Sequence, residues 1–159
     1  MVLRVSTPRS NTRRMRILLP LFLLVLSASS LSGQLWSDSF EAAQTAARES
    51  GKNVVLVFSG SDWCAPCIKL EREIWSDAEF QRTAPKSFVF YRADFPRKKE
   101  HRLPEALAAR NGQLAEQYNS RGAFPLVVVL TPEGELLGQA GYEKTDPAAY
   151  LHRLEAFTE

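Results

Sequence analysis

The sequence has few of the residues that build covalent frameworks or metal sites. Its 159 residues include only two cysteines and two histidines. The cysteines lie together in one short stretch, as Cys64 and Cys67. A disulfide between them closes too short a loop to restrict the unfolded chain strongly, so it would be a poor structural staple. The pair is therefore expected to serve a chemical purpose.

No apolar run reaches the roughly 20 residues that a membrane-spanning helix needs. The run at residues 17–26 has ten residues, follows five arginines without any acidic residue, and precedes several small residues. This order is typical of a signal peptide. We therefore expect a signal peptide at residues 1–33, with Met15 as an alternative start, and one domain at residues 34–159. A retained interfacial anchor is the competing interpretation.

The predicted leader also indicates where the protein acts. The pair Arg13 and Arg14 leaves twin-arginine export open beside the general secretory route. Both routes end outside the cytoplasm, so the expected localisation is the periplasm or the secreted fraction. A lone dithiol would meet oxidising conditions there.

Charge is unevenly distributed along the chain. With the leader's five arginines removed, 15 basic residues remain against 18 acidic ones, a net charge of −3 for residues 34–159. This balance does not favour nucleic acid as a partner. Residues 96–104 form a basic segment that is expected to be an exposed loop. A site for an acidic partner is its alternative interpretation.

Hydrophobic patterning alternates between helix and strand. Helices are expected over residues 37–49, 64–75, 76–82, 105–118 and 146–157, and strands over 53–59, 87–95, 126–130 and 135–142. Ser37 or Asp38 is the expected cap of the first helix, and a capping box at Ser76 and Glu79 is expected to start the short one. Strands that alternate with helices and end in a hairpin predict an α/β fold with a mixed sheet and helices on both faces.

The two cysteines stand at the mouth of a predicted helix, after a buried strand and a polar turn. A helix start offers unpaired N–H groups and a positive dipole end, and both favour a thiolate. The pKa of a thiol at Cys64 can therefore fall into a reactive range. Cys67 lies about one turn further on, within reach of a disulfide with Cys64. Pro66 is tolerated in the first helical turn.

The string Trp63-Cys64-Ala65-Pro66-Cys67, placed between strand and helix, resembles the thioredoxin superfamily. The longer string 60–67 resembles exported bacterial members of that family. The resemblance covers nearly all of residues 35–158 and implies the thioredoxin fold. It also implies a cis-proline at Pro125, with the backbone of Phe124 pairing with an extended substrate. Trp63, Ala65, Pro66, Phe124 and Pro125 are the expected substrate-binding residues.

The resemblance implies a thiol–disulfide oxidoreductase with Cys64 and Cys67 as its catalytic residues. Cys64, typically the more exposed of the pair, is expected to attack a substrate disulfide, and Cys67 to resolve the mixed disulfide. Reduction is favoured, because Ala65-Pro66 is closer to the Gly-Pro of reductants than to the Pro-His of strong oxidants. The expected partners are disulfide-containing proteins and a membrane electron donor, and the expected state is a monomer without cofactor or metal.

Three alternatives stay open at this point. In the first, the pair donates disulfides as an oxidase; in the second, it belongs to a non-catalytic binding module; in the third, it holds zinc together with His101 and His152. The sequence also departs from thioredoxin, since the strand before the motif carries Val57 and Phe58 where thioredoxin has a buried aspartate. Asp62, in the turn, is a candidate replacement as proton acceptor for Cys67.

Overall fold

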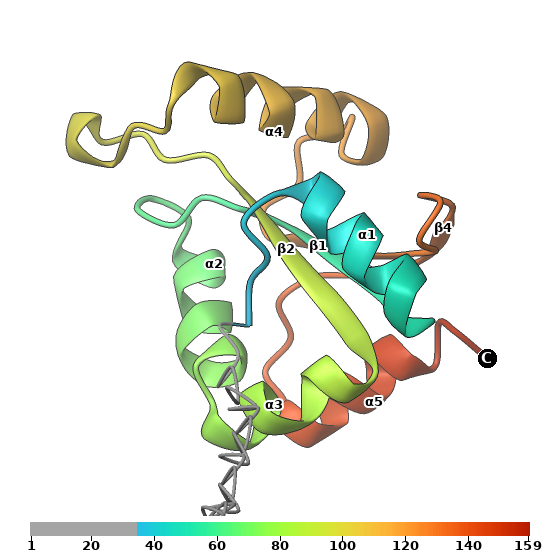
Figure 1. Cartoon of the computed structure of the whole chain (residues 1–159). Coiled ribbons are helices and arrows are strands. Elements are labelled where there is room, and N and C mark those ends of the chain that lie inside the picture. Colours follow the sequence, from blue (N-terminus) through green and yellow to red (C-terminus); the bar gives the residue numbers. More distant parts are fainter. Residues whose placement is uncertain (1–34) are drawn as a thin grey trace, which may run out of the picture. The chain divides into compact units, whose positions relative to one another are not determined.

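The computed structural model describes residues 35–159, so the predicted leader lies outside the described residues. These residues form four strands and five α-helices (Figure 1). The strands are β1 (Asn53–Ser59), β2 (Phe88–Asp94), β3 (Leu126–Leu130) and β4 (Leu136–Ala140). The helices are α1 (Phe40–Ser50), α2 (Ala65–Leu70), α3 (Ala78–Thr83), α4 (Glu105–Tyr118) and α5 (Pro147–Glu155). A π-helical turn (Glu71–Trp75) continues α2, and 3₁₀ turns lie at Ala84–Lys86 and Lys99–His101.

The four strands form one mixed sheet in the order β2-β1-β3-β4. β2 runs parallel to β1, whereas β3 is antiparallel to both β1 and β4. β1 is central and is buried from Val54 to Ser59, as its continuous apolar run predicts. Ser59 is paired with Asp94 at the ends of the two parallel strands. The loops that follow β1 and β2 therefore leave the sheet from the same edge.

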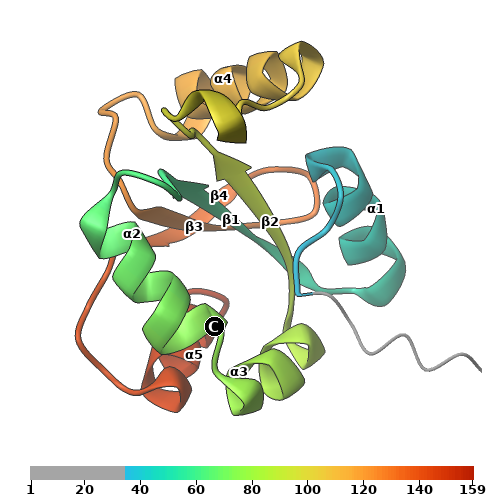
Figure 2. The ribbon, with the colours of Figure 1, turned by 90° about the vertical axis from the view of Figure 1, so that its left-hand side faces the viewer.

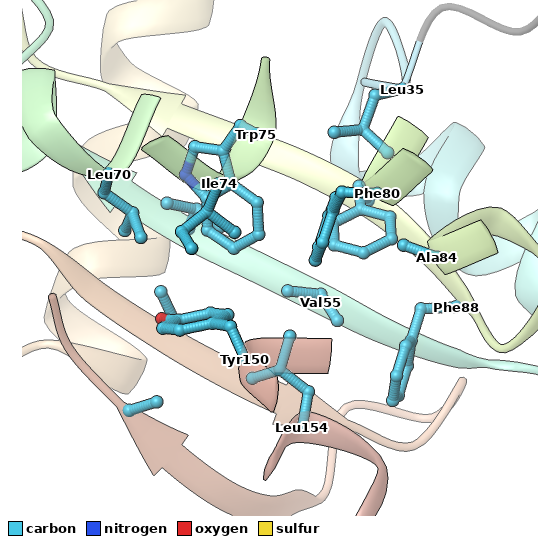
Figure 3. Close-up of a cluster of buried hydrophobic side chains, with 14 of the residues drawn as sticks. Leu35, Val55, Leu70, Ile74, Trp75, Phe80, Ala84, Phe88, Tyr150 and Leu154 are labelled. Atoms are coloured by element: carbon cyan, nitrogen blue, oxygen red, sulfur yellow. The ribbon is translucent and has the colours of Figure 1, made fainter. Parts of the chain in front are cut away.

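Alternate residues of the strands enter two separate cores, because successive side chains of a strand point to opposite faces. On one face, Val55, Val57, Val127 and Val129 pack against α2, the π-helical turn, α3 and α5. On the other, Val54, Leu56, Val128 and Leu130 pack against α1 and α4. Figure 2 shows the sheet between these two groups of helices, and Figure 3 shows the first core around Trp75 and Tyr150. The predicted thioredoxin fold is confirmed.

Two predicted helix starts are wrong by a residue or more. α1 is capped by Ser39, whose side chain accepts from the N–H of Ala42 at 3.0 Å. Ser37 cannot start the helix, because its N–H donates to Phe90 O and holds it beside β2. α3 is capped by Asp77, since the backbone of Ser76 still belongs to the preceding helical turn.

Other signals are confirmed as predicted. Gly51 ends α1 in the left-handed conformation, with φ of 66°, which glycine adopts without strain. Asp146 caps α5 and Pro147 occupies its first turn. Within residues 35–159, no helix combines the length and apolarity needed to cross a bilayer.

Candidate functional site

The two cysteines lie where β1 gives way to α2. Cys64 is the N-cap of α2 and forms a disulfide with Cys67, with 5.2 Å between the Cα atoms. The N–H of Cys67 donates to the Sγ of Cys64 at 3.2 Å. A donor aimed at this sulfur at a helix start stabilises negative charge on Cys64. The expected difference in exposure is absent, because both cysteines are 4% exposed in this disulfide form.

The second predicted part of the site meets the first through aromatic contacts. The Phe124–Pro125 peptide bond is cis, as the resemblance implies. The rings of Phe124 and Trp63 lie 5.4 Å apart between centroids in an edge-to-face arrangement. Buried Asn119 shapes the turn before them, because its amide both donates to Ala123 O and accepts from Ala123 N–H.

Trp63 is fixed on several sides. Its indole N–H donates to Phe95 O at 2.7 Å, which ties the motif to the segment after β2. The guanidinium carbon of Arg97 lies 3.6 Å from the centre of its ring. Gly60 lies so close beneath the indole that a Cβ at this position would collide with it. Trp63 is thus packed into the turn and takes part in the rim of the site through its remaining surface.

The Asp62 carboxylate binds the segment after β2 and does not face the cysteines. Its carboxylate accepts from the backbone N–H groups of Arg97 and Lys98, both at 2.9 Å, and lies 3.1 Å from Nδ1 of His101. The Asp62 side chain is only 3% exposed. The hydrogen bond from Arg97 N–H, with those of Lys98 and His101, lowers the pKa of Asp62. Asp62 is therefore a structural anchor, and its suggested role as proton acceptor for Cys67 does not fit this geometry.

A small hollow of about 80 Å³ lies beside Cys67. It is lined by Ser59, Ser61, Cys67, Ile68, Glu71 and Arg92. Glu71 and Arg92 are ion-paired, and the Arg92 guanidinium lies 4.0 Å from the ring centre of Trp36. Val57 and Phe58 of β1 are buried and supply no acid. The carboxylate that shares a cavity with Cys67 is thus Glu71, which comes from the next turn of the helix and was missed by comparing strands alone.

The cations on the helix are engaged away from the sulfurs. Lys69 lies 5.9 Å from the ring centre of Tyr142, and Arg72 donates to Glu73. Within residues 35–159, no group of three or more His, Cys, Asp or Glu side chains is arranged to hold a metal ion. His101 faces Asp62.

The surface around the disulfide is partly apolar. Ala65 and Pro66 are exposed at the start of α2, and Ile68 is 45% exposed. Together with Trp63 and the Phe124–Pro125 segment, they offer a rim that an extended polypeptide can contact. The predicted binding residues are thus gathered around the two cysteines.

The fold, the Cys64–Cys67 pair and the cis-proline segment are those of one class of redox proteins, and residues 35–132 match the family described as thioredoxin-like. The chain belongs to this family. The disulfide bond reductase DsbH of Chlamydia pneumoniae is 33% identical to it over 131 residues, which cover 82% of this chain and 75% of DsbH. A solved structure of a DsbH oxidoreductase matches with a TM-score of 0.70 and 32% identity, over 77% of this chain and 82% of that one.

More distant relatives share the fold over most of the chain. A thioredoxin from Thermus thermophilus matches with a TM-score of 0.55 at 22% identity, over 75% of this chain and 83% of that one. The thioredoxin-related protein DsbJ of Chlamydia pneumoniae is 25% identical, and the match covers 84% of this chain but 39% of DsbJ. The family and the DsbH relatives identify the chain as a thiol–disulfide oxidoreductase, whose partners exchange disulfides with it.

Proposed function

We propose that the protein is an exported reductase of protein disulfides, with Cys64 as nucleophile and Cys67 as resolving cysteine. The observation that carries this assignment is the position of Cys64 at the helix start, where its Sγ accepts from Cys67 N–H. Ala65-Pro66 between the cysteines and the likeness to a relative named as a disulfide bond reductase support reduction as the direction. The signal peptide proposed for residues 1–33 supports action in the periplasm or outside the cell.

The reaction proceeds by two exchanges between sulfurs. The Cys64 thiolate attacks one sulfur of a substrate disulfide, so that a mixed disulfide forms and the other substrate sulfur leaves as a thiolate. The Cys67 thiolate then attacks the Sγ of Cys64, which releases the second substrate thiolate and closes the Cys64–Cys67 disulfide. Two electrons pass to the substrate. A second dithiol, which we assign to a membrane protein donor, restores them by the same chemistry.

The surroundings of the pair support these steps. Glu71 lines the hollow beside Cys67, and we assign to it the removal of the Cys67 proton before the second exchange. The exposed rim of Ala65, Pro66 and Ile68 excludes water from one side of a docked chain. The backbone of Phe124, presented by the turn that Asn119 holds, pairs with an extended substrate segment.

A trapping experiment tests this function. The purified protein, reduced beforehand, is mixed with a peptide that contains one disulfide, and free thiols are measured with time. We expect stoichiometric reduction by the wild-type protein and a stable mixed disulfide through Cys64 in Cys67→Ser, seen by mass spectrometry. A Cys67→Ser protein that forms no adduct, while the wild-type protein leaves the peptide oxidised, would refute the assignment.

A further inference from the structure

The basic segment after β2 is built into the rim of the dithiol site. Asp62, two residues before Cys64, binds the backbone of Arg97 and Lys98, and Trp63 binds Phe95 O. Figure 1 shows this segment running into α4 beside the turn that precedes α2. We propose that residues 97–102 form a docking surface for proteins that carry acidic residues next to their target disulfide. The inference rests on the proposed function and specifies its substrates.

The charges of this segment are left available to a partner. Arg97, Lys98, Lys99, His101 and Arg102 are all exposed. In the described part of the chain, ion pairs engage Arg72, Arg82, Arg92, Arg110, Arg153 and His101, but none engages Arg97, Lys98, Lys99 or Arg102. Glu100 is the one acid among residues 97–102, so a positive field remains there in a domain whose net charge is −3.

Nearby carboxylates do not cancel this field at the surface. Asp62 is buried beneath the segment, with its oxygens turned to backbone N–H groups. Glu71 is paired with Arg92, and Glu73 accepts from Arg72 and from the Tyr142 hydroxyl. These carboxylates, and that of Asp94, which accepts from the N–H and hydroxyl of Ser61, are thus engaged by neighbours, whereas the cations of the segment are exposed. Such a distribution steers and orients oppositely charged partners.

The segment also has a shape that suits a polypeptide. A hollow of about 180 Å³ lies where it meets α4, and it is lined by Asp94, Phe95, Pro96, Arg102, Leu103 and Ala108. The lining combines apolar walls with Arg102, and its one acid, Asp94, is hydrogen-bonded to Ser61, so the hollow can hold an apolar side chain next to an acidic one that pairs with Arg102. Because Asp62 already fixes the backbone of the segment, the segment loses little conformational entropy when a partner docks.

Matched peptides and matched variants test the inference. Three synthetic peptides of equal length carry one disulfide flanked by Asp, by Lys or by Ser, and their second-order rates of reduction are measured at low salt. We expect the Asp peptide to react about tenfold faster than the Lys peptide, and the difference to vanish in 1 M NaCl, where the Debye length falls to about 3 Å.

Lys99→Glu is expected to reduce the rate with the Asp peptide severalfold and to leave the Ser peptide unaffected. The control is Lys86→Glu, which has the same change of charge on an exposed lysine before the start of β2, at the opposite end of the sheet from the dithiol. This control should keep the wild-type ratio of rates. Far-ultraviolet circular dichroism verifies that both variants are folded.

Several results would overturn the inference. Equal rates with the Asp and Lys peptides would refute the docking surface and leave the reductase function intact. A preference for the Asp peptide that persists in Lys99→Glu would do the same. Binding to vesicles of phosphatidylserine and phosphatidylcholine that Lys99→Glu abolishes, without any preference among peptides, would assign the segment to a lipid surface instead. If no peptide were reduced, the proposed function would fail and the inference with it.

Discussion

Trp63 and Trp75 are the same residue type in two opposite settings. Trp75 is 2% exposed and makes edge-to-face contacts with Trp36, Phe80, Phe90 and Tyr150, at centroid distances of 5.2–6.1 Å. Trp63 is partly exposed, hydrogen-bonded through its indole N–H, and covered on one face by a cation. The first contributes apolar surface to a core, and the second holds loops in place around a reactive pair.

This contrast extends to the regions around the two residues. Around Trp75 the contacts come from helices and strands that bury apolar surface, so stability is concentrated there. Around Cys64, Asp62 and Trp63 make hydrogen bonds between loops, Asn119 holds its own turn through Ala123, and Trp63 also contacts Phe124 and Arg97. Substitutions around Trp75 should therefore affect mainly the stability of the fold, and substitutions around Cys64 mainly its activity.

The largest expected effect belongs to the cysteines. Cys64→Ser should reduce disulfide reduction to the background rate, because the remaining Cys67 lies inside α2 rather than at its N-cap and has no second cysteine to resolve a mixed disulfide. Its unfolding free energy should stay close to that of the reduced wild-type protein, since residue 64 retains a capping hydroxyl group. Peptide reduction and urea unfolding measure the two quantities. A variant with wild-type turnover would contradict the assigned nucleophile.

The next effect compares the two tryptophans directly. Trp75→Ala should lower the unfolding free energy by about 3–5 kcal/mol, the usual cost of truncating a large buried aromatic side chain. Trp63→Ala should lower it less, because part of the ring is already exposed, yet slow peptide reduction more in the folded protein. Urea unfolding and rates at a fixed folded concentration check this. If the same variant showed the larger loss in both the unfolding free energy and the rate of reduction, the contrast between the two tryptophans would be contradicted.

Glu71→Gln tests the hollow beside Cys67. If Glu71 takes the Cys67 proton, this variant should slow the second exchange by about 10²-fold near neutral pH, the lower end of the usual range for such assistance. The loss should shrink at alkaline pH, where the Cys67 thiol ionises without help. Glu73→Gln is the matched control, because Glu73 bonds to Arg72 and Tyr142 and does not line the hollow. Equal rates for both variants would exclude this role.

The smallest expected effect concerns Asp62 and depends on pH. Its pKa is lowered in the folded protein by the N–H of Arg97, so the ionised carboxylate stabilises the fold fully above the ordinary aspartate pKa of about 4. That contribution is lost as pH falls through the lower, folded pKa. Asp62→Asn should therefore be less stable than wild type at pH 7, with the gap narrowing below about pH 4. Thermal unfolding of both proteins across pH 3–7 measures this difference in stability. A difference that does not change with pH would contradict the role of Asp62 as an anchor.

The sequence predicts the fold well because its main signals are local. The apolar run of β1, Gly51 and Pro147 act within a few residues, and all were placed correctly. The site was predicted where it too is local, at Cys64 and Cys67. The contacts of Asp62 and Glu71 were not predicted, because each depends on a partner that only the tertiary structure identifies. For Asp62 and Glu71 these partners, Arg97 and Arg92, lie 35 and 21 residues away.

The reduction potential of the Cys64–Cys67 couple tests the proposed reductase most directly. The purified protein is equilibrated against glutathione and dithiothreitol buffers, and the oxidised fraction is read from thiol labelling. We expect a reversible two-electron couple at about −270 to −200 mV, the range of reductants and glutaredoxins. A couple near about −120 mV would identify an oxidant instead. The absence of any reversible couple would contradict the redox role of the pair altogether.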